Sequence, residues 1–205
     1  MSKLKSINPN NFKWFDYERY SFSLGLSLDE SLYISGHSAS EYDALDKKIV
    51  VKGGMREQVN TALDKIECIL NAEGASLSDA THITENVTIK GLNHYSDYEK
   101  VRTERLPSNI NQQLLVVDSL LRVDALIELE IRVERGRDYS EDKVVNLPTL
   151  TASDSIDKND IVAQTEDIYK QADKILKKMG FELSDIVKTV DHITPEGLMD
   201  YKYTG

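Results

Sequence analysis

The sequence predicts an α+β protein whose unit has the order ββαβαββ, repeated in tandem with the second copy truncated. Three observations support this prediction. Segments with alternating apolar residues surround two segments with helical periodicity, and much of this pattern occurs twice in the chain. Because crossovers between strands and helices favour parallel neighbours, we expect a mixed sheet backed by both helices on one face.

An internal repeat defines the domain organisation. Shifting the sequence by 106 positions aligns residues 58–95 with residues 164–201 without a gap, and eleven of the 38 pairs are identical. The first copy continues for about 40 residues beyond its aligned block, whereas the second ends at Gly205. We therefore expect a first domain at residues 1–137 and a partial second domain at residues 138–205. Either the second copy is truncated or a complementary C-terminal polypeptide supplies its missing strands.

Hydrophobic periodicity places the individual elements. Apolar residues recur at helical spacing from Val59 to Leu70, and Gly74 follows where a helix C-cap is expected. In chain order, the first copy is expected to contain strands at 19–28 and 31–39, a helix at 55–73, a strand at 80–89, a helix at 94–105, and strands at 112–121 and 125–134. The second copy is expected to contain a strand at 143–151, a helix at 161–178 that stops at Gly180, and a strand at 186–194.

The strand at 125–134 separates apolar from charged residues. Alternate positions from Ala125 to Val133 are apolar, whereas the positions between them include Glu128, Glu130 and Arg132. In a sheet backed by helices, the charged side either faces water or meets another subunit with a ligand between them. Self-association of this chain is therefore expected.

Composition limits the class of protein. The chain is 40% hydrophobic and 29% charged, with no apolar run near the ~18 residues of a membrane span and no apolar stretch of signal-peptide type at its N-terminus. These features predict a cytoplasmic protein that does not enter a membrane. A net charge of −10 disfavours binding to nucleic acid. The four histidines are scattered and Cys68 is the single cysteine, so no metal site and no cofactor are expected.

Three stretches together resemble a known family. They are LYISGHSA at 32–39, EQVNTALDKIECILNAEGASLSDATHITENVTIKGLNHY at 57–95 and LIELEIRV at 126–133. They are similar to the Rid family of reactive intermediate deaminases, also called the YjgF family, over residues 19–135 and again over residues 143–201. The resemblance implies the chorismate-mutase-like Rid fold and trimers with pockets between subunits. It also implies hydrolysis of imines and enamines from small metabolites to a keto acid and ammonia.

The resemblance also implies site residues. The tyrosine of the family's early "YS" pair matches Tyr20, the glycine of its "SG" pair matches Gly36, and the acidic residue of its last strand matches Glu128. Imine hydrolysis needs a water molecule placed over an electrophilic carbon, and a carboxylate such as Glu128 can orient that water. Alternatively, Tyr20 is an interface aromatic, Gly36 only ends a strand, and Glu128 is a solvated residue of the polar face.

Two positions depart from the family's pattern. The arginine that clamps the substrate carboxylate in the deaminases corresponds to Gln113, and an asparagine beside the pocket corresponds to Glu99. An amide cannot replace the charge or the bidentate geometry of arginine. Arg102, Arg105 and Arg122 are near in sequence, and either one of them replaces the clamp in space or all three are exposed helix and loop arginines.

Three classes of function remain open at this point. The first is a hydrolase acting on a neutral or differently charged imine, enamine or related C–N bond, with Glu128 as the catalytic residue. The second is a non-catalytic Rid-like module that binds a ligand or serves as a scaffold, which the loss of the arginine favours. The third is a ribonuclease, which the acidic charge and the lack of a histidine pair disfavour.

Overall fold

The chain divides into two units of structure, Met1–Arg137 and Asp138–Gly205, and each is described by itself. The computed structural model describes residues 4–20, 22–135, 147–194, 197 and 200. Among these residues, no helix combines the length and the apolar character needed to cross a membrane.

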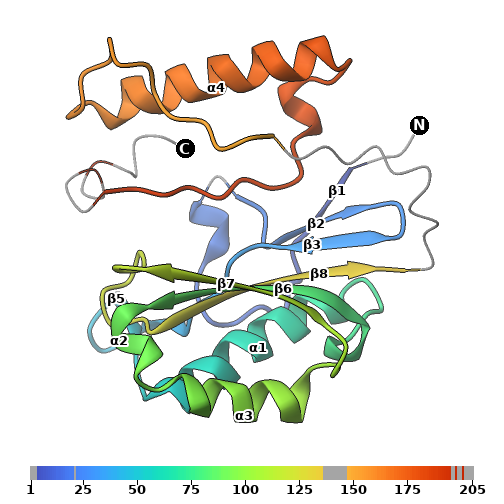
Figure 1. The fold of residues 1–205 in the computed structure, drawn as a ribbon. Helices are drawn as coiled ribbons and strands as arrows, with labels where there is room; N and C mark the ends of the chain where they lie inside the picture. Colours follow the sequence, from blue (N-terminus) through green and yellow to red (C-terminus); the bar gives the residue numbers. More distant parts are fainter. Residues whose placement is uncertain (1–3, 21, 136–146, 195–196, 198–199, 201–205) are drawn as a thin grey trace. The chain divides into compact units, whose positions relative to one another are not determined.

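The first unit is built on a six-stranded mixed sheet (Figure 1). Its strands lie in the order β1-β2-β3-β8-β6-β7. They are β1 Lys5–Ile7, β2 Gly25–Leu28, β3 Ser31–Ile34, β6 Ala80–Thr88, β7 Asn111–Val117 and β8 Ile127–Glu134. β6 and β7 run parallel, and the other neighbours are antiparallel. This arrangement confirms the predicted mixed sheet.

The helices α1 (Met55–Asn71) and α3 (Tyr95–Arg105) cover one face of this sheet, and the short α2 (Ile89–Leu92) precedes α3 (Figure 1). The Glu57 carboxylate accepts the Gly54 N–H at 3.0 Å and so caps the start of α1. Gly74 has a φ of +66° after its end, where the predicted C-cap lies. These local signals explain why the helix begins and ends near the predicted residues.

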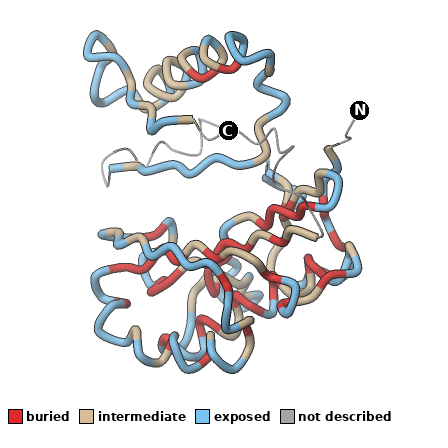
Figure 2. The backbone as a smooth tube through the Cα atoms, turned by 45° about the vertical axis from the view of Figure 1, so that its right-hand side comes forward, coloured by how far each residue is buried: buried red, intermediate tan, exposed pale blue. Residues whose placement is uncertain are grey.

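The core lies between the sheet and these helices. Figure 2 shows the buried residues concentrated along the strands and the helices of the first unit. The fully buried side chains include Val59, Leu63, Ile66 and Ile69 of α1, Ile83 and Val87 of β6, and Ile127 and Leu129 of β8. One carboxylate, Glu85, is buried among them, and it accepts hydrogen bonds from the hydroxyls of Tyr95 and Tyr98 on α3. Glu85 therefore faces the helices, and so do Ile83 and Val87, which lie two positions away on β6.

Several elements differ from the sequence prediction. The expected strands 19–28, 31–39 and 112–121 are shorter, because residues 17–19 form a 3₁₀ turn and β3 ends at Ile34 before the Ser35-Gly36 step. The hairpin of β4 (Ser40–Asp43) and β5 (Lys48–Val51), together with β1, were not predicted. Strand β1 has only three residues, and such short elements carry little periodicity.

The second unit repeats local features of the first. Its helix α4 spans Ile161–Lys178 as predicted, the Asp160 carboxylate caps it by accepting the Ala163 N–H at 2.9 Å, and Gly180 has a φ of +83°. A Leu-Ser-Asp 3₁₀ turn follows the helix in both units, at Leu77–Asp79 and Leu183–Asp185. The aligned segments therefore share a helix, a glycine stop and a turn.

The expected strands of the second unit are not observed. The prediction of a strand at 186–194 was wrong, because these residues are irregular. Residues 147–151 are also irregular, and residues 143–146 of that expected strand lie outside the described residues. The described part of this unit contains no strand that could act as a pairing partner, and an isolated strand leaves its backbone groups unpaired. Within 147–194 only Ala172 and Leu176 are buried (Figure 2).

A threonine-glycine turn occurs in both units. The Thr88 hydroxyl accepts the Gly91 N–H at 2.9 Å, and the Thr194 hydroxyl accepts the Gly197 N–H at 3.3 Å. The surroundings of the two glycines differ. A Cβ added at Gly91 would lie 2.3 Å from the backbone oxygen of Leu126, whereas the nearest atoms at Gly197 are the ends of side chains, at 3.1 Å or more.

Candidate functional site

Glu128 lies on the sheet face opposite α1 and α3. It pairs with Asn86 of β6, and Asn86 directly follows Glu85, whose side chain faces α3. Because successive residues of a strand point to opposite faces, Asn86 and Glu128 share the helix-free face. The amide of Asn86 also donates to the Glu130 carboxylate at 3.1 Å. This face therefore places two carboxylates of β8 beside one amide of β6.

The structure brings Gly36 and Glu128 into direct contact. A Cβ added at Gly36 would lie 2.7 Å from Oε1 of Glu128 and 3.0 Å from its Cδ. The next residue, His37, exchanges two backbone hydrogen bonds with Leu129, at 2.9 and 3.0 Å. Only glycine leaves room for the carboxylate at this point. Two of the residues that the resemblance implied thus form one local site.

Glu128 has the electrostatics of a proton acceptor near neutral pH. Burial, and then the neighbouring Glu130, raise the pKa of its carboxyl from 4.5 to about 7, and the charge of Lys65 opposes this rise. A general base is most effective when its pKa lies near the working pH. At neutral pH, Glu128 can therefore accept a proton from water and return it.

A buried lysine lies behind this site. Lys65 of α1 has no exposed surface, and its Nζ donates to the Ser38 carbonyl at 2.7 Å, to the Ser40 carbonyl, and to the Ser40 hydroxyl at 3.3 Å. Burial lowers the pKa of the Lys65 ammonium to about 7, although Glu41 and Glu128 favour its charged form. Sequence reasoning missed this residue, yet its spacing from Ala62 and Ile69 places it on the buried stripe of the helix.

His37 is a second buried titratable group. Burial, and then the charge of Lys65, lower the pKa of His37 to about 3, so its imidazole is neutral. Its ring packs near Phe12, with ring centroids 6.0 Å apart. The Nε2 atom of His37 is buried and has no hydrogen-bond partner among the described residues.

Tyr20 belongs to an aromatic cluster. Its ring stacks on Phe22, with centroids 5.5 Å apart, and meets the edge of Phe15 at 6.2 Å. Tyr20 and Phe22 are 43% and 47% exposed. The following segment is tied to the Gly36 region, because the Ser35 hydroxyl donates to the Ser23 carbonyl at 2.8 Å.

Gln113 is on the same face as Glu128 but on a different strand. It is exposed on β7 and pairs with Thr84 of β6, which in turn pairs with Glu130. Strand spacing separates β7 from β8 by about 10 Å. A ligand that touched both Gln113 and Glu128 within one subunit would have to span that distance.

Glu99, Arg102 and Arg105 do not join this site. Glu99 is exposed on α3, which covers the other face of the sheet. Arg105 forms ion pairs with Asp64 at 2.7 Å and Glu67 at 3.0 Å on α1, and the Arg102 guanidinium lies beside the Gln112 side chain. Arg105 is thus paired with α1, and Arg102 contacts Gln112 of β7, whose side chain is on the opposite face of the sheet from Gln113, so these two arginines do not replace the clamp at Gln113.

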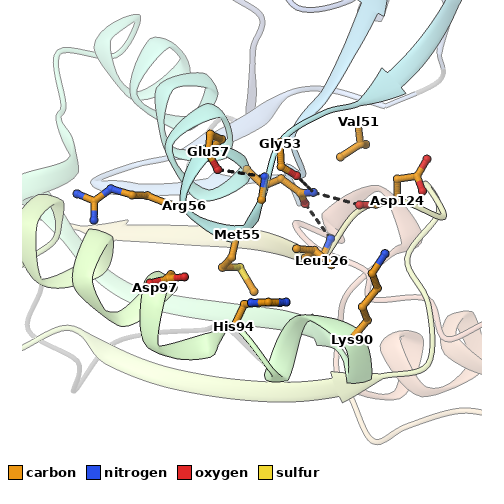
Figure 3. Close-up of a pocket in the computed structure, with 12 residues that line it drawn as sticks. Val51, Gly53, Met55, Arg56, Glu57, Lys90, His94, Asp97, Asp124 and Leu126 are labelled. Carbon is orange, nitrogen blue, oxygen red and sulfur yellow. Dashed lines mark hydrogen bonds between the residues drawn. The ribbon is translucent and has the colours of Figure 1, made fainter.

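A cavity of about 600 Å³ lies elsewhere, at the N-terminus of α1 (Figure 3). The Gln58 side chain braces its wall by donating to the carbonyls of Gly53 and Asp124, both at 3.1 Å, and by accepting the Leu126 N–H at 2.8 Å. Lys90 and His94 also line it. None of the predicted site residues borders this cavity, and the described residues contain no cluster of three or more potential metal ligands.

Comparison with known proteins identifies the family. The family model described as Endoribonuclease L-PSP matches residues 17–134 of the chain. The chain belongs to this family. It is the Rid (YjgF) family, so the resemblance read from the sequence motifs is confirmed at this level. The match falls within the first unit.

Curated relatives agree with this assignment. A RutC family protein of Sulfurisphaera tokodaii is 30% identical over 115 residues, which are 56% of this chain and 88% of the relative. A RutC family protein of Pyrococcus abyssi is 35% identical over 109 residues, which are 53% of this chain and 82% of the relative.

Solved structures share the fold. RidA from Psychrobacter sp. PAMC 21119 matches with a TM-score of 0.52 at 18% identity, over 63% of this chain and 99% of that chain. Escherichia coli TdcF, whose structure contains bound serine, matches with a TM-score of 0.51 at 18% identity, over 64% of this chain and 98% of that chain. At these identities the likeness concerns the fold alone.

Proposed function

We propose that the first unit hydrolyses a carbon–nitrogen double bond in a small metabolite, with Glu128 as the general base. The contact between Gly36 and Glu128 carries this proposal, because it seats a carboxylate with a pKa near 7 on the helix-free face. A carboxylate with this pKa can activate water at neutral pH by itself. The proposed reaction therefore needs no metal and no cofactor.

The reaction proceeds by addition and elimination. Glu128 accepts a proton from a water molecule as the water oxygen bonds to the imine carbon, and the nitrogen takes a proton from solvent to give a carbinolamine. Glu128 then returns its proton to the nitrogen, the C–N bond breaks, and the carbinolamine hydroxyl loses a proton to solvent to give the carbonyl product and ammonia. Water is consumed and no oxidant or reductant is needed. An enamine enters the same sequence after protonation of its carbon.

The charge of the face selects the substrate. Glu128 and Glu130 are adjacent on it, and the clamping position holds the neutral Gln113. An anionic 2-imino acid would be disfavoured by several kcal/mol relative to an arginine-containing site if the site is desolvated. We infer that the substrate is a neutral or cationic imine. The same carboxylates disfavour an RNA phosphate backbone and so argue against ribonuclease activity here.

The proposed site also depends on how subunits assemble. The helix-free face bears Gln113 and Glu128 on separate strands, and the exposed ring of Tyr20 lies in a loop outside the sheet. We propose a homo-oligomer, based on trimers, in which a second subunit meets this face and encloses a small-molecule pocket between subunits. The recurring helix, glycine stop and turn support a second copy of the Rid unit in tandem, to which a complementary polypeptide can add strands.

The test compares two imines that differ in charge. A flavin amine oxidase generates a neutral imine, and an amino-acid oxidase generates an anionic 2-imino acid, while ammonia release is followed with and without the protein. Faster release from the neutral imine, lost in Glu128→Gln, is the expected result. If neither imine is hydrolysed faster than in buffer by a folded oligomer, the non-catalytic ligand-binding or scaffold function replaces this proposal.

A further inference from the structure

Lys65 is an unusual residue to find inside a protein. A lysine is almost never fully buried unless its ammonium is paired or hydrogen-bonded, because removing the charge from water is costly. Lys65 is fully buried and uses three acceptors, all on Ser38 and Ser40. Such an arrangement implies a role for the ammonium that an apolar residue at this helical position would not provide.

The three hydrogen bonds fasten one segment of chain to α1. Nζ of Lys65 bonds the carbonyls of Ser38 and Ser40, which follow Gly36 and His37 in the chain. His37 is in turn fixed to Leu129 by two backbone hydrogen bonds, and Gly36 abuts the carboxylate of Glu128. The hydrogen bonds of Lys65 therefore help to hold residues 36–40 in place, and with them the position of Gly36 against Glu128.

We infer that Lys65 is a positioning residue for Glu128, because it fastens the segment that seats the carboxylate and supplies a positive charge that stabilises its ionised form. Among the described residues, Lys65 makes no ion pair within 4 Å. Its charge acts on Glu128 across the protein interior, which screens charges less than water does. This inference deepens the proposed function, and its catalytic consequence rests on it.

Other charged groups also act on Lys65 and Glu128. Glu41 favours the charged form of Lys65, and Glu130 opposes ionisation of Glu128. The charge of Lys65 also lowers the pKa of His37, whose imidazole is neutral above about pH 3. Lys65 is thus the one group whose charge lowers the pKa of the Glu128 carboxyl among the causes identified for it.

The test is a pair of substitutions in the full chain. Lys65→Met keeps most of the length of the side chain and removes the charge, whereas Lys65→Arg keeps the charge. The pKa of Glu128 is measured by carbon-13 NMR titration of its carboxyl. We expect it to rise by roughly one unit or more in Lys65→Met, as the loss of a nearby opposite charge predicts, and to change little in Lys65→Arg. The acidic limb of the imine-hydrolysis profile should move to higher pH by the same amount.

The outcomes separate this inference from the proposed function. An unchanged Glu128 pKa in folded Lys65→Met overturns the inference, as does an activity loss that is equal at all pH values. A shifted pKa in a protein that hydrolyses no imine supports the inference and refutes the proposed function. If Lys65→Met does not fold, Glu128→Gln supplies the reciprocal measurement. Loss of the Glu128 charge should lower the pKa of Lys65, observed by nitrogen-15 NMR, and no change would again overturn the inference.

Discussion

Glu128 should make the first unit less stable as pH rises from about 4.5 to 7. Its pKa is raised from 4.5 to about 7 by burial, so in this window the folded protein binds a proton that the unfolded chain releases. Raising pH through the window therefore removes stability. At ~1.4 kcal/mol per pKa unit, the contribution amounts to about 3 kcal/mol at most. Glu128→Gln cannot ionise, so its stability relative to the parent should increase by about 1–3 kcal/mol across this range.

Urea unfolding at several pH values measures this difference. Trp14 is the only tryptophan and packs against the core of the first unit, so its fluorescence reports on that unit. Subtracting the parent's free energy of unfolding from that of the variant at each pH removes the contributions of titrating groups that do not interact with Glu128. Glu18→Gln is the matched control, since Glu18 is exposed and should give a nearly constant difference. A difference for Glu128→Gln that is equally flat from pH 4.5 to 7.5 would refute the reasoning.

Three further substitutions test the site and the core. Gly36→Ala places a methyl 2.7 Å from the Glu128 carboxylate, so imine hydrolysis should fall at least tenfold while circular dichroism shows a folded protein; retained activity would contradict the assigned seat. Gln113→Arg should raise activity on anionic 2-imino acids, measured as keto-acid release, and no gain in a correctly assembled protein argues against the clamp position. Leu63→Ala should cost about 2–5 kcal/mol in urea unfolding, whereas Val123→Ala, at an 82% exposed position, should change stability by less than about 0.5 kcal/mol.

Long periodic segments predicted the fold well. The helix at α4 begins and ends where the sequence placed it, because Asp160 and Gly180 mark its two ends. The alternation in β8 identified the charged face that carries Glu128. Short elements were missed, and the expected strand at 186–194 was wrong. A strand depends on a neighbouring strand for its backbone hydrogen bonds, and no local pattern shows whether that neighbour is present.

The site was only partly predictable for a related reason. Motif matching placed Gly36 and Glu128, which the fold brings into contact from distant parts of the chain. It also pointed to Glu99, which the fold places on the other side of the sheet. Lys65 escaped notice because a lysine in an amphipathic helix ordinarily faces water. Its burial depends on acceptors at Ser38 and Ser40, which are brought to it only by tertiary packing.

The two threonine-glycine turns impose unequal tolerance to mutation on the two halves of the chain. At Gly91 any side chain meets a backbone oxygen of Leu126, which can move away only if β8 moves with it. At Gly197 the obstacles are the methyl ends of Ile161 and Ile193, which can rotate. In a library of random variants selected for folding, residue 91 should stay glycine while residue 197 accepts alanine and serine. Identical residues in two aligned segments can thus be under different structural constraints, or under a constraint in one segment only.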